Sequence, residues 1–140
     1  MSVIVVDSSV AAKWFFDEIH TGAARRALEG RHERHAPDFY LLETENIICR
    51  RIRRGELAVA EGNRIRAALR RMPVQTYSFL TLMDPGYAIA TQTGRSLYDC
   101  LYVALAELLD ARMATADRRL YDALAKTPFA DRVLWIEDIP

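Results

Sequence analysis

The order of apolar and polar positions along the 140-residue chain alternates between short continuous apolar runs and longer runs with helical spacing. The β-branched run Ser2–Val6 predicts a strand buried on both faces of a parallel sheet. Other short runs predict strands that end at Pro37 or cover 74–77, 112–116 and 133–136. Apolar residues three and four apart predict helices at 10–15, 17–30, 38–54, 59–72, 80–93, 97–108 and 119–124. This alternation predicts an α/β fold with a central parallel sheet flanked by helices.

Two of these helices, 38–54 and 59–72, are predicted to form a hairpin that stands out from the sheet. The hairpin region from 50 to 71 holds eight arginines and only two acids, Glu56 and Glu61. Half of the arginines close the first helix, which suits the negative end of its dipole. Those four are either a solvated helix end or a surface for nucleic-acid phosphates or an acidic partner, and both interpretations stay open: Arg50, Arg51, Arg53 and Arg54.

The overall composition is that of one ordinary globular domain covering residues 1–140. Nineteen basic and nineteen acidic residues cancel, so net charge excludes no class of partner. No stretch approaches the about twenty apolar residues of a membrane span, and no signal segment opens the chain. Neither Cys49 nor Cys100 belongs to a CxxC pair, so both are predicted to be reduced core residues. We therefore expect a cytoplasmic protein.

Four acids stand in unusual places. Asp7 and Asp117 each follow a predicted strand, where chemistry collects in open parallel sheets, although Asp7 also has the position of a helix cap. Asp99 falls in the first turn of an apolar helix with Ser96 as its expected N-cap. Glu43 lies in the apolar half of helix 38–54, with Asn46 one turn further along. These positions make the four acids candidates for one site.

Four carboxylates gathered in one cleft would repel and raise one another's pKa values, and a divalent cation would resolve that conflict. Oxygen ligands without a companion Cys or His suit Mg²⁺ or Mn²⁺ rather than zinc. Such a metal would position a water, lower its pKa and neutralise charge on a phosphoryl group. His32 and His35 have the spacing of a ligand pair, but nothing completes a zinc set, so they are predicted to be solvated loop residues.

Four segments in order resemble the motifs of PIN-domain proteins, in particular the VapC-type toxins of toxin–antitoxin pairs. They are V-V-D-S-S-V at 5–10, P-D-F-Y-L-L-E-T-E-N at 37–46, S-L-Y-D-C-L-Y-V-A-L-A at 96–106 and T-A-D at 115–117. Each is weak alone, but the four together cover nearly the whole chain. The resemblance implies a three-layer PIN-like fold and a metal-dependent ribonuclease that cuts RNA with a metal-activated water.

The resemblance also implies particular roles. The catalytic and metal-binding acids would be Asp7, Glu43, Asp99 and Asp117, with Mg²⁺ or Mn²⁺ as the cofactor. Ser9, Asn46 and Thr115 would support them. Glu45 competes with Glu43 for the helix acid, and the Glu-x-x-Asn spacing favours Glu43. A VapB-type antitoxin and a second copy of the chain are the implied partners besides RNA. Trp14 and Phe15 are either contacts for such partners or core residues.

Two alternative functions require residues that this chain lacks. A haloacid-dehalogenase-like phosphatase requires an acid two residues after the first, where Ser9 stands, and a later lysine. A receiver-like phosphoacceptor domain requires paired acids and a late lysine, which are also absent. The remaining alternative is a catalytically silent PIN-like module that binds RNA or protein without cutting. Metal binding without turnover would distinguish this module from an enzyme.

Overall fold

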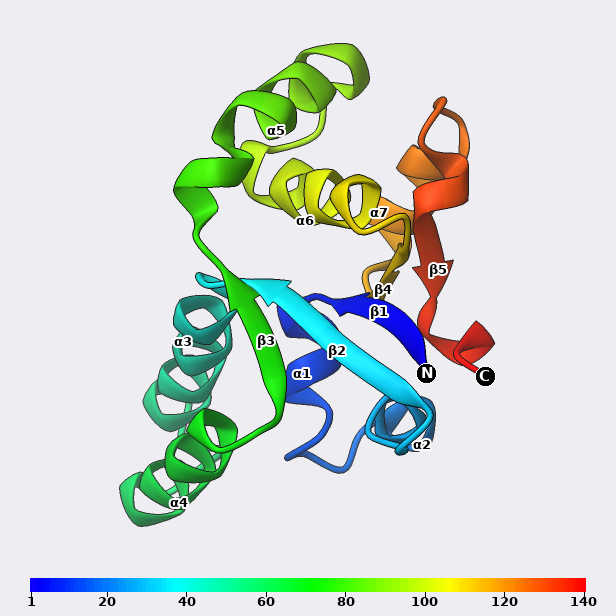
Figure 1. Ribbon diagram of the computed structural model, residues 1–140. Helices are drawn as coiled ribbons and strands as arrows, with labels where there is room; N and C mark the ends of the chain where they lie inside the picture. Colours follow the sequence, from blue (N-terminus) through cyan, green and yellow to red (C-terminus); the bar gives the residue numbers. More distant parts are fainter.

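Five parallel strands form a single sheet at the centre of the molecule. In the computed structural model, which describes residues 1–140, the strands pair in the order β3-β2-β1-β4-β5 (Figure 1). Their bounds are β1 Ser2–Val6, β2 His32–Pro37, β3 Val74–Tyr77, β4 Arg112–Thr115 and β5 Val133–Trp135. The predicted α/β class and parallel sheet are confirmed.

Helices cover both faces of this sheet. Figure 1 shows α5 and α6 on one side and α1, α2 and α3 on the other. No helix is long and apolar enough to cross a membrane. The helix bounds are α1 Ser8–Ala12, α2 Thr21–Arg26, α3 Tyr40–Arg53, α4 Val59–Arg70, α5 Phe79–Thr93, α6 Leu97–Leu108 and α7 Arg118–Ala125, with 3₁₀ turns Ala130–Arg132 and Ile136–Asp138.

The strand order reverses direction between β1 and β4. The chain first steps outward from β1 to β2 and β3, then crosses back through α5 and α6 to β4 on the other side of β1. Val6 of β1 pairs with Ala114 of β4, so these two strands end side by side. Connections leave such a point in opposite directions, and open α/β sheets bind ligands there.

Strand β1 and helix α6 contribute much of the core. Every residue of α6 from Cys100 to Ala106 is buried, because α6 packs on the sheet and also against α5. Gly86 of α5 permits this close approach: a Cβ there would lie 2.4 Å from Leu101 Cδ2. The opening strand and this apolar helix fix the frame on which Asp7 and Asp99 are placed.

The two histidines differ from the sequence prediction. His32 and His35 lie within β2 and are buried, so the prediction of a solvated loop was wrong. The His32 ring satisfies both of its nitrogens, Nδ1 with Ser2 Oγ at 2.7 Å and Nε2 with the Pro140 carbonyl at 3.1 Å. His35 is likewise paired, with the Tyr77 hydroxyl at 2.8 Å. Full pairing makes burial of an imidazole tolerable.

The positions of the two cysteines and of Trp14 and Phe15 agree only in part with the sequence predictions. Cys100 is buried as predicted, but Cys49 is exposed on α3, so its predicted core position was wrong. Trp14 is a core residue whose Nε1 donates to the Ala24 carbonyl at 2.9 Å, and Phe15 is only partly buried. Pro85, which is exposed, is the seventh residue of α5.

The basic helical hairpin is formed by α3 and α4, which pack against each other. Gly55, at a φ of 74°, makes the turn after α3. Glu45 of α3 pairs with Arg66 and with Arg70 of α4, the latter at 3.0 Å. Two of the hairpin arginines therefore hold its helices together.

Candidate active site

Asp7 lies where β1 passes into α1. Its Oδ1 accepts hydrogen bonds from the Ser9 hydroxyl at 2.5 Å and from the Val10 backbone N–H at 3.1 Å, so it does cap α1. Burial raises the pKa of Asp7 to about 6, against the opposing effect of these hydrogen bonds, and the nearby charge of Glu43 raises it further. Asp7 is therefore both a helix cap and a carboxylate whose charged form is destabilised by burial.

Ser9 and Thr115 connect the ends of β1 and β4. The Ser9 hydroxyl, which donates to Asp7, accepts from the Ala116 N–H at 2.9 Å. Thr115 Oγ1 accepts from the Asp117 N–H at 3.0 Å. Asp117 in turn caps α7 by accepting from the Leu120 N–H at 3.2 Å. These bonds place the two strand-end acids, Asp7 and Asp117, on one edge of the sheet.

Glu43 is placed by α3 and held by α6. Its Oε1 accepts a hydrogen bond from the Tyr102 hydroxyl at 2.6 Å. Burial raises the pKa of Glu43, the Tyr102 bond opposes this, and the charge of Asp99 raises the pKa further. Burial and the neighbouring Glu43 charge raise the pKa of Tyr102 well above its ordinary value, so Tyr102 remains a proton donor to the carboxylate.

Asp99 occupies the first turn of α6, as predicted. The Ser96 hydroxyl caps this helix by accepting from the Asp99 N–H at 3.1 Å. Burial raises the pKa of Asp99, the bond with Ser96 and the charge of Arg95 lower it, and the charge of Asp117 raises it. Asp99 is thus an electrostatic neighbour of Asp117 and of Glu43.

Electrostatic interactions connect the four acids Asp7, Glu43, Asp99 and Asp117, which we call the acidic array. The charge of Glu43 raises the pKa of Asp7, the charge of Asp99 raises the pKa of Glu43, and the charge of Asp117 raises the pKa of Asp99. No three Asp, Glu, His or Cys side chains of the chain converge closely enough to enclose a cation. The donor chemistry nevertheless fits Mg²⁺ or Mn²⁺, because the array offers only oxygen ligands and three of its carboxyls have raised pKa values.

The remaining predicted residues lie at different distances from the acidic array. Asn46 is exposed one turn beyond Glu43, whereas Glu45 pairs with arginines of α4 and is not part of the array. The basic end of α3 starts seven residues after Glu43, about 10 Å along the helix axis. Within it, Arg51 pairs with Glu18 and stacks over the Phe16 ring. The other three are exposed and form no ion pair: Arg50, Arg53 and Arg54.

The fold and this array define a class of protein with known relatives. Residues 4–126 match the PIN domain family. A ribonuclease, VapC3 of Pyrobaculum aerophilum, is 30% identical over 119 residues, which cover 84% of this chain and 91% of the relative. The crystal structure of PAE2754 from Pyrobaculum aerophilum has a TM-score of 0.70 at 22% identity and covers 98% of this chain and 93% of its own.

A toxin–antitoxin complex from Klebsiella pneumoniae shares the fold, with a TM-score of 0.63 at 14% identity over 94% of this chain and 95% of its own. The chain belongs to the PIN domain family. Within that family it is of the VapC type, as the ordered motifs of the sequence indicate.

Sequence reasoning did not identify two residues beside the acidic array, Tyr102 and Arg95. Tyr102 lies in the buried apolar stripe of α6, a position typical of core residues, although its spacing of three from Asp99 places both near one face. Arg95 precedes α6 in a short connection, and its Nη2 lies 3.8 Å from Asp99 Oδ2. Only the three-dimensional arrangement shows that both residues contact the acids.

Proposed function

We propose that the protein is a metal-dependent endoribonuclease and the toxin of a VapBC-type toxin–antitoxin pair. The observation that carries this proposal is the acidic array at the switch point between β1 and β4, with three carboxyls whose pKa values are raised by burial and mutual repulsion. Relatives named as ribonucleases on the same fold support the reaction class.

The acidic array would hold Mg²⁺ or Mn²⁺ through carboxylate oxygens, directly or through water. The cation would supply Lewis-acid chemistry, lowering the pKa of water and neutralising charge on the phosphate. The chain's own contribution is to orient these oxygens. Ser9 fixes Asp7, Ser96 fixes the turn that carries Asp99, and Tyr102 fixes Glu43 through its 2.6 Å hydrogen bond.

The exposed arginines of the hairpin would bind the RNA backbone. Arg50, Arg53 and Arg54 present unpaired guanidinium groups at the end of α3, the helix that also carries Glu43. Cationic side chains attract the phosphate chain without regard to sequence. Arg51 contributes less to this surface because Glu18 already neutralises it.

The proposed partners are a VapB-type antitoxin and a second copy of the chain. The antitoxin is supported by the fold shared with a toxin–antitoxin complex. For the second copy, an apolar groove with a cavity volume of about 360 Å³ lies between α3, α5 and α6, and self-association of such faces buries apolar area. The seven lining residues are Phe39, Leu42, Phe79, Met83, Leu97, Tyr98 and Leu101. The proposed location of the protein is the cytoplasm.

The first test is cleavage of a mixed RNA pool by purified protein free of antitoxin. Wild type would be assayed with Mn²⁺, with Mg²⁺ and with EDTA, beside Asp99→Asn. Metal-dependent cutting that Asp99→Asn loses would support the proposal. A folded wild type that binds metal and RNA without cutting would instead support the silent binding module.

A further inference from the structure

Arg95 lies in the short connection between α5 and α6, one helical turn before Asp99 of the acidic array. Gly94 ends α5 at a φ of 73°, and the Ser96 side chain caps α6. Between them, the Arg95 backbone N–H donates to Thr93 Oγ1 at 3.2 Å. The backbone around Arg95 is therefore fixed, and its side chain starts from a defined point beside the array.

Arg95 differs from every other partly buried arginine of the chain. Four of the five partly buried arginines donate side-chain hydrogen bonds to the protein: Arg26, Arg34, Arg51 and Arg132. The guanidinium of Arg95 donates none. Its Nε is the one buried side-chain nitrogen or oxygen in the molecule without a hydrogen-bond partner. A buried N–H without an acceptor costs free energy, so folding stability does not explain this arrangement.

The contact between Arg95 and Asp99 does not satisfy the guanidinium. The 3.8 Å between Arg95 Nη2 and Asp99 Oδ2 exceeds hydrogen-bond distance, so charge alone relates the two groups. About a third of each side chain remains accessible, 31% for Arg95 and 30% for Asp99. Apart from the buried Nε, the guanidinium donors of Arg95 form no hydrogen bond and are available to a ligand that approaches the acidic array.

We propose, building on the ribonuclease function, that Arg95 binds an RNA backbone phosphate at the acidic array. A cluster of carboxylates repels a phosphodiester, and a fixed cation at its edge offsets that repulsion. The planar guanidinium fork also matches two phosphate oxygens, which an ammonium group does not. Arg95 is then a substrate-binding residue on the α5–α6 side of the site, separate from the arginines of the hairpin.

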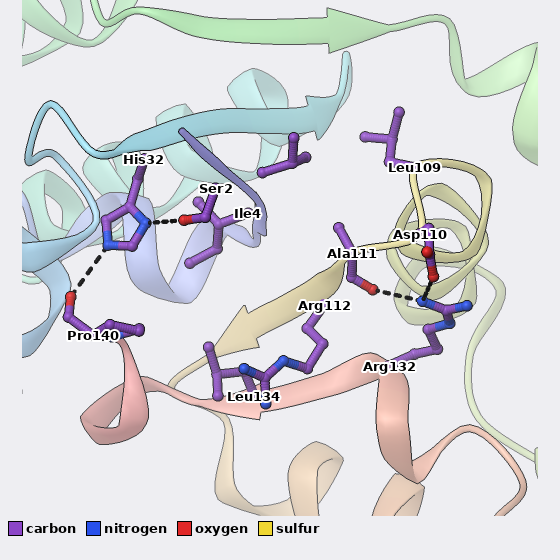
Figure 2. A pocket seen from close by; sticks show the side chains of 11 residues that line it. Ser2, Ile4, His32, Leu109, Asp110, Ala111, Arg112, Arg132, Leu134 and Pro140 are labelled. Carbon is purple, nitrogen blue, oxygen red and sulfur yellow. Dashed lines mark hydrogen bonds and ion pairs between the residues drawn. The ribbon is translucent and has the colours of Figure 1, made fainter.

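Three variants test this role. Arg95→Met retains the aliphatic stem and removes the charge, whereas Arg95→Lys retains the charge and removes the fork. Arg112→Met is the matched control, because Arg112 is exposed, forms no ion pair and lines the pocket at the other end of β4 (Figure 2). The measurements are KM for RNA cleavage with Mn²⁺, and RNA affinity by fluorescence anisotropy in EDTA, both over a range of KCl concentrations.

Arg95→Met should weaken RNA binding by about 10- to 100-fold, the effect of one charge-assisted contact. The slope of log affinity against log salt should fall by about 0.7, one phosphate contact on a single strand. Arg95→Lys should restore the salt slope but only part of the affinity. Arg95→Met should be at least as stable as wild type in thermal unfolding, since no hydrogen bond is lost and an unsatisfied buried N–H is removed. Arg112→Met should bind RNA as wild type does.

A different pattern would overturn the inference. If Arg95 serves only as a counter-ion to Asp99, Arg95→Met will change Mn²⁺ affinity but leave RNA affinity and its salt slope at the wild-type values. A wild type that does not cut counts against the ribonuclease function. The anisotropy measurement still decides the role of Arg95 in that case, because it requires no turnover.

Discussion

Polar side chains at the two ends of the parallel sheet have different neighbours: complementary hydrogen-bond partners at the amino end and further acids at the carboxyl end. At the amino end, the buried His32 ring bonds to Ser2 and Pro140, and the partly buried Arg132 bonds to the exposed Asp110 (Figure 2). At the carboxyl end, the buried Asp7 and the half-buried Glu43 lie next to further acids.

The nature of the neighbours distinguishes a buried polar group that stabilises the fold from one that belongs to a candidate functional site. His32 and Asp7 are almost equally inaccessible, 3% and 6% exposed, so burial alone does not distinguish them. Complementary partners at the amino end stabilise the fold. Like charges at the carboxyl end destabilise it in the absence of a cation, and such perturbed groups cluster at functional sites. The acidic array therefore costs stability, which makes it the candidate functional site of the chain.

The largest expected effect is on cleavage by Asp7→Asn. The asparagine oxygen still accepts from Val10 and Ser9, so the cap of α1 is retained while the charge is lost. We expect RNA cleavage to fall by about a thousandfold or more, since an electrostatic group at the reacting centre is removed. Asp110→Asn, at the other end of the sheet, is the control. Cleavage by Asp7→Asn at the wild-type rate would remove Asp7 from the site.

The second prediction concerns the stability of metal-free protein against pH. The pKa of Asp7 is about 6 when folded and near its usual value of about 4 when unfolded, so the folded state holds the proton more tightly. The free energy of unfolding should therefore decrease by about 3 kcal/mol as pH rises from about 4 through about 6. The raised pKa values of Glu43 and Asp99 act in the same direction.

Urea unfolding in EDTA across this pH range measures the effect. Asp7→Asn should flatten the decrease and be more stable than wild type above pH 6, because it carries no charge to bury. Saturating Mn²⁺ should reverse the decrease for wild type. Wild-type stability that rises through this window in parallel with Asp7→Asn would contradict the assigned pKa of Asp7.

A smaller effect is expected at the amino end of the sheet, where His32→Ala removes a paired and buried imidazole. We expect a loss of about 2 kcal/mol in the free energy of unfolding, because two hydrogen bonds and packing are lost. RNA cleavage below the melting temperature should not change. A selective loss of cleavage with unchanged stability would show that the two ends of the sheet are not functionally distinct.

The smallest effect is expected for Tyr102→Phe, which removes only the hydroxyl that bonds to Glu43. Cleavage should fall by about tenfold, the consequence of one lost orienting hydrogen bond. The pKa of Glu43 should rise, since that bond opposes the effect of burial, and the acid limb of the pH–rate profile should move to higher pH. A uniform decrease in rate without movement of the profile would argue against orientation of Glu43 by Tyr102.

Much of the fold was predictable because its strongest signals are local. The run at 2–6 and the apolar pattern at 97–108 gave β1 and α6 nearly residue for residue, and Ser96 marked the helix start. Errors arose where partners are distant in sequence. His32 is buried because Ser2 and Pro140 satisfy it, and no local pattern reveals contacts across 30 and 108 residues.

The site was only partly predictable for the same reason. Asp7 and Asp117 became candidates because each follows a predicted strand, and Asp99 and Glu43 because each lies in an apolar part of a predicted helix. The ordered motifs then gave the same four acids. Tyr102 and Arg95 were missed because their roles depend on contacts rather than on motif positions. A sequence shows which residues are able to act, whereas the structure shows which polar groups remain without complementary partners.

The most direct test of the acidic array is to measure Mn²⁺ binding to metal-free protein by electron paramagnetic resonance. Wild type, Asp99→Asn and Asp110→Asn would be titrated near neutral pH and at about pH 5, below the pKa of Asp7. Wild type and Asp110→Asn should bind Mn²⁺ near neutral pH and more weakly at the lower pH, and Asp99→Asn should bind about tenfold more weakly or worse. Equal binding by wild type and Asp99→Asn would contradict a cation site in the acidic array.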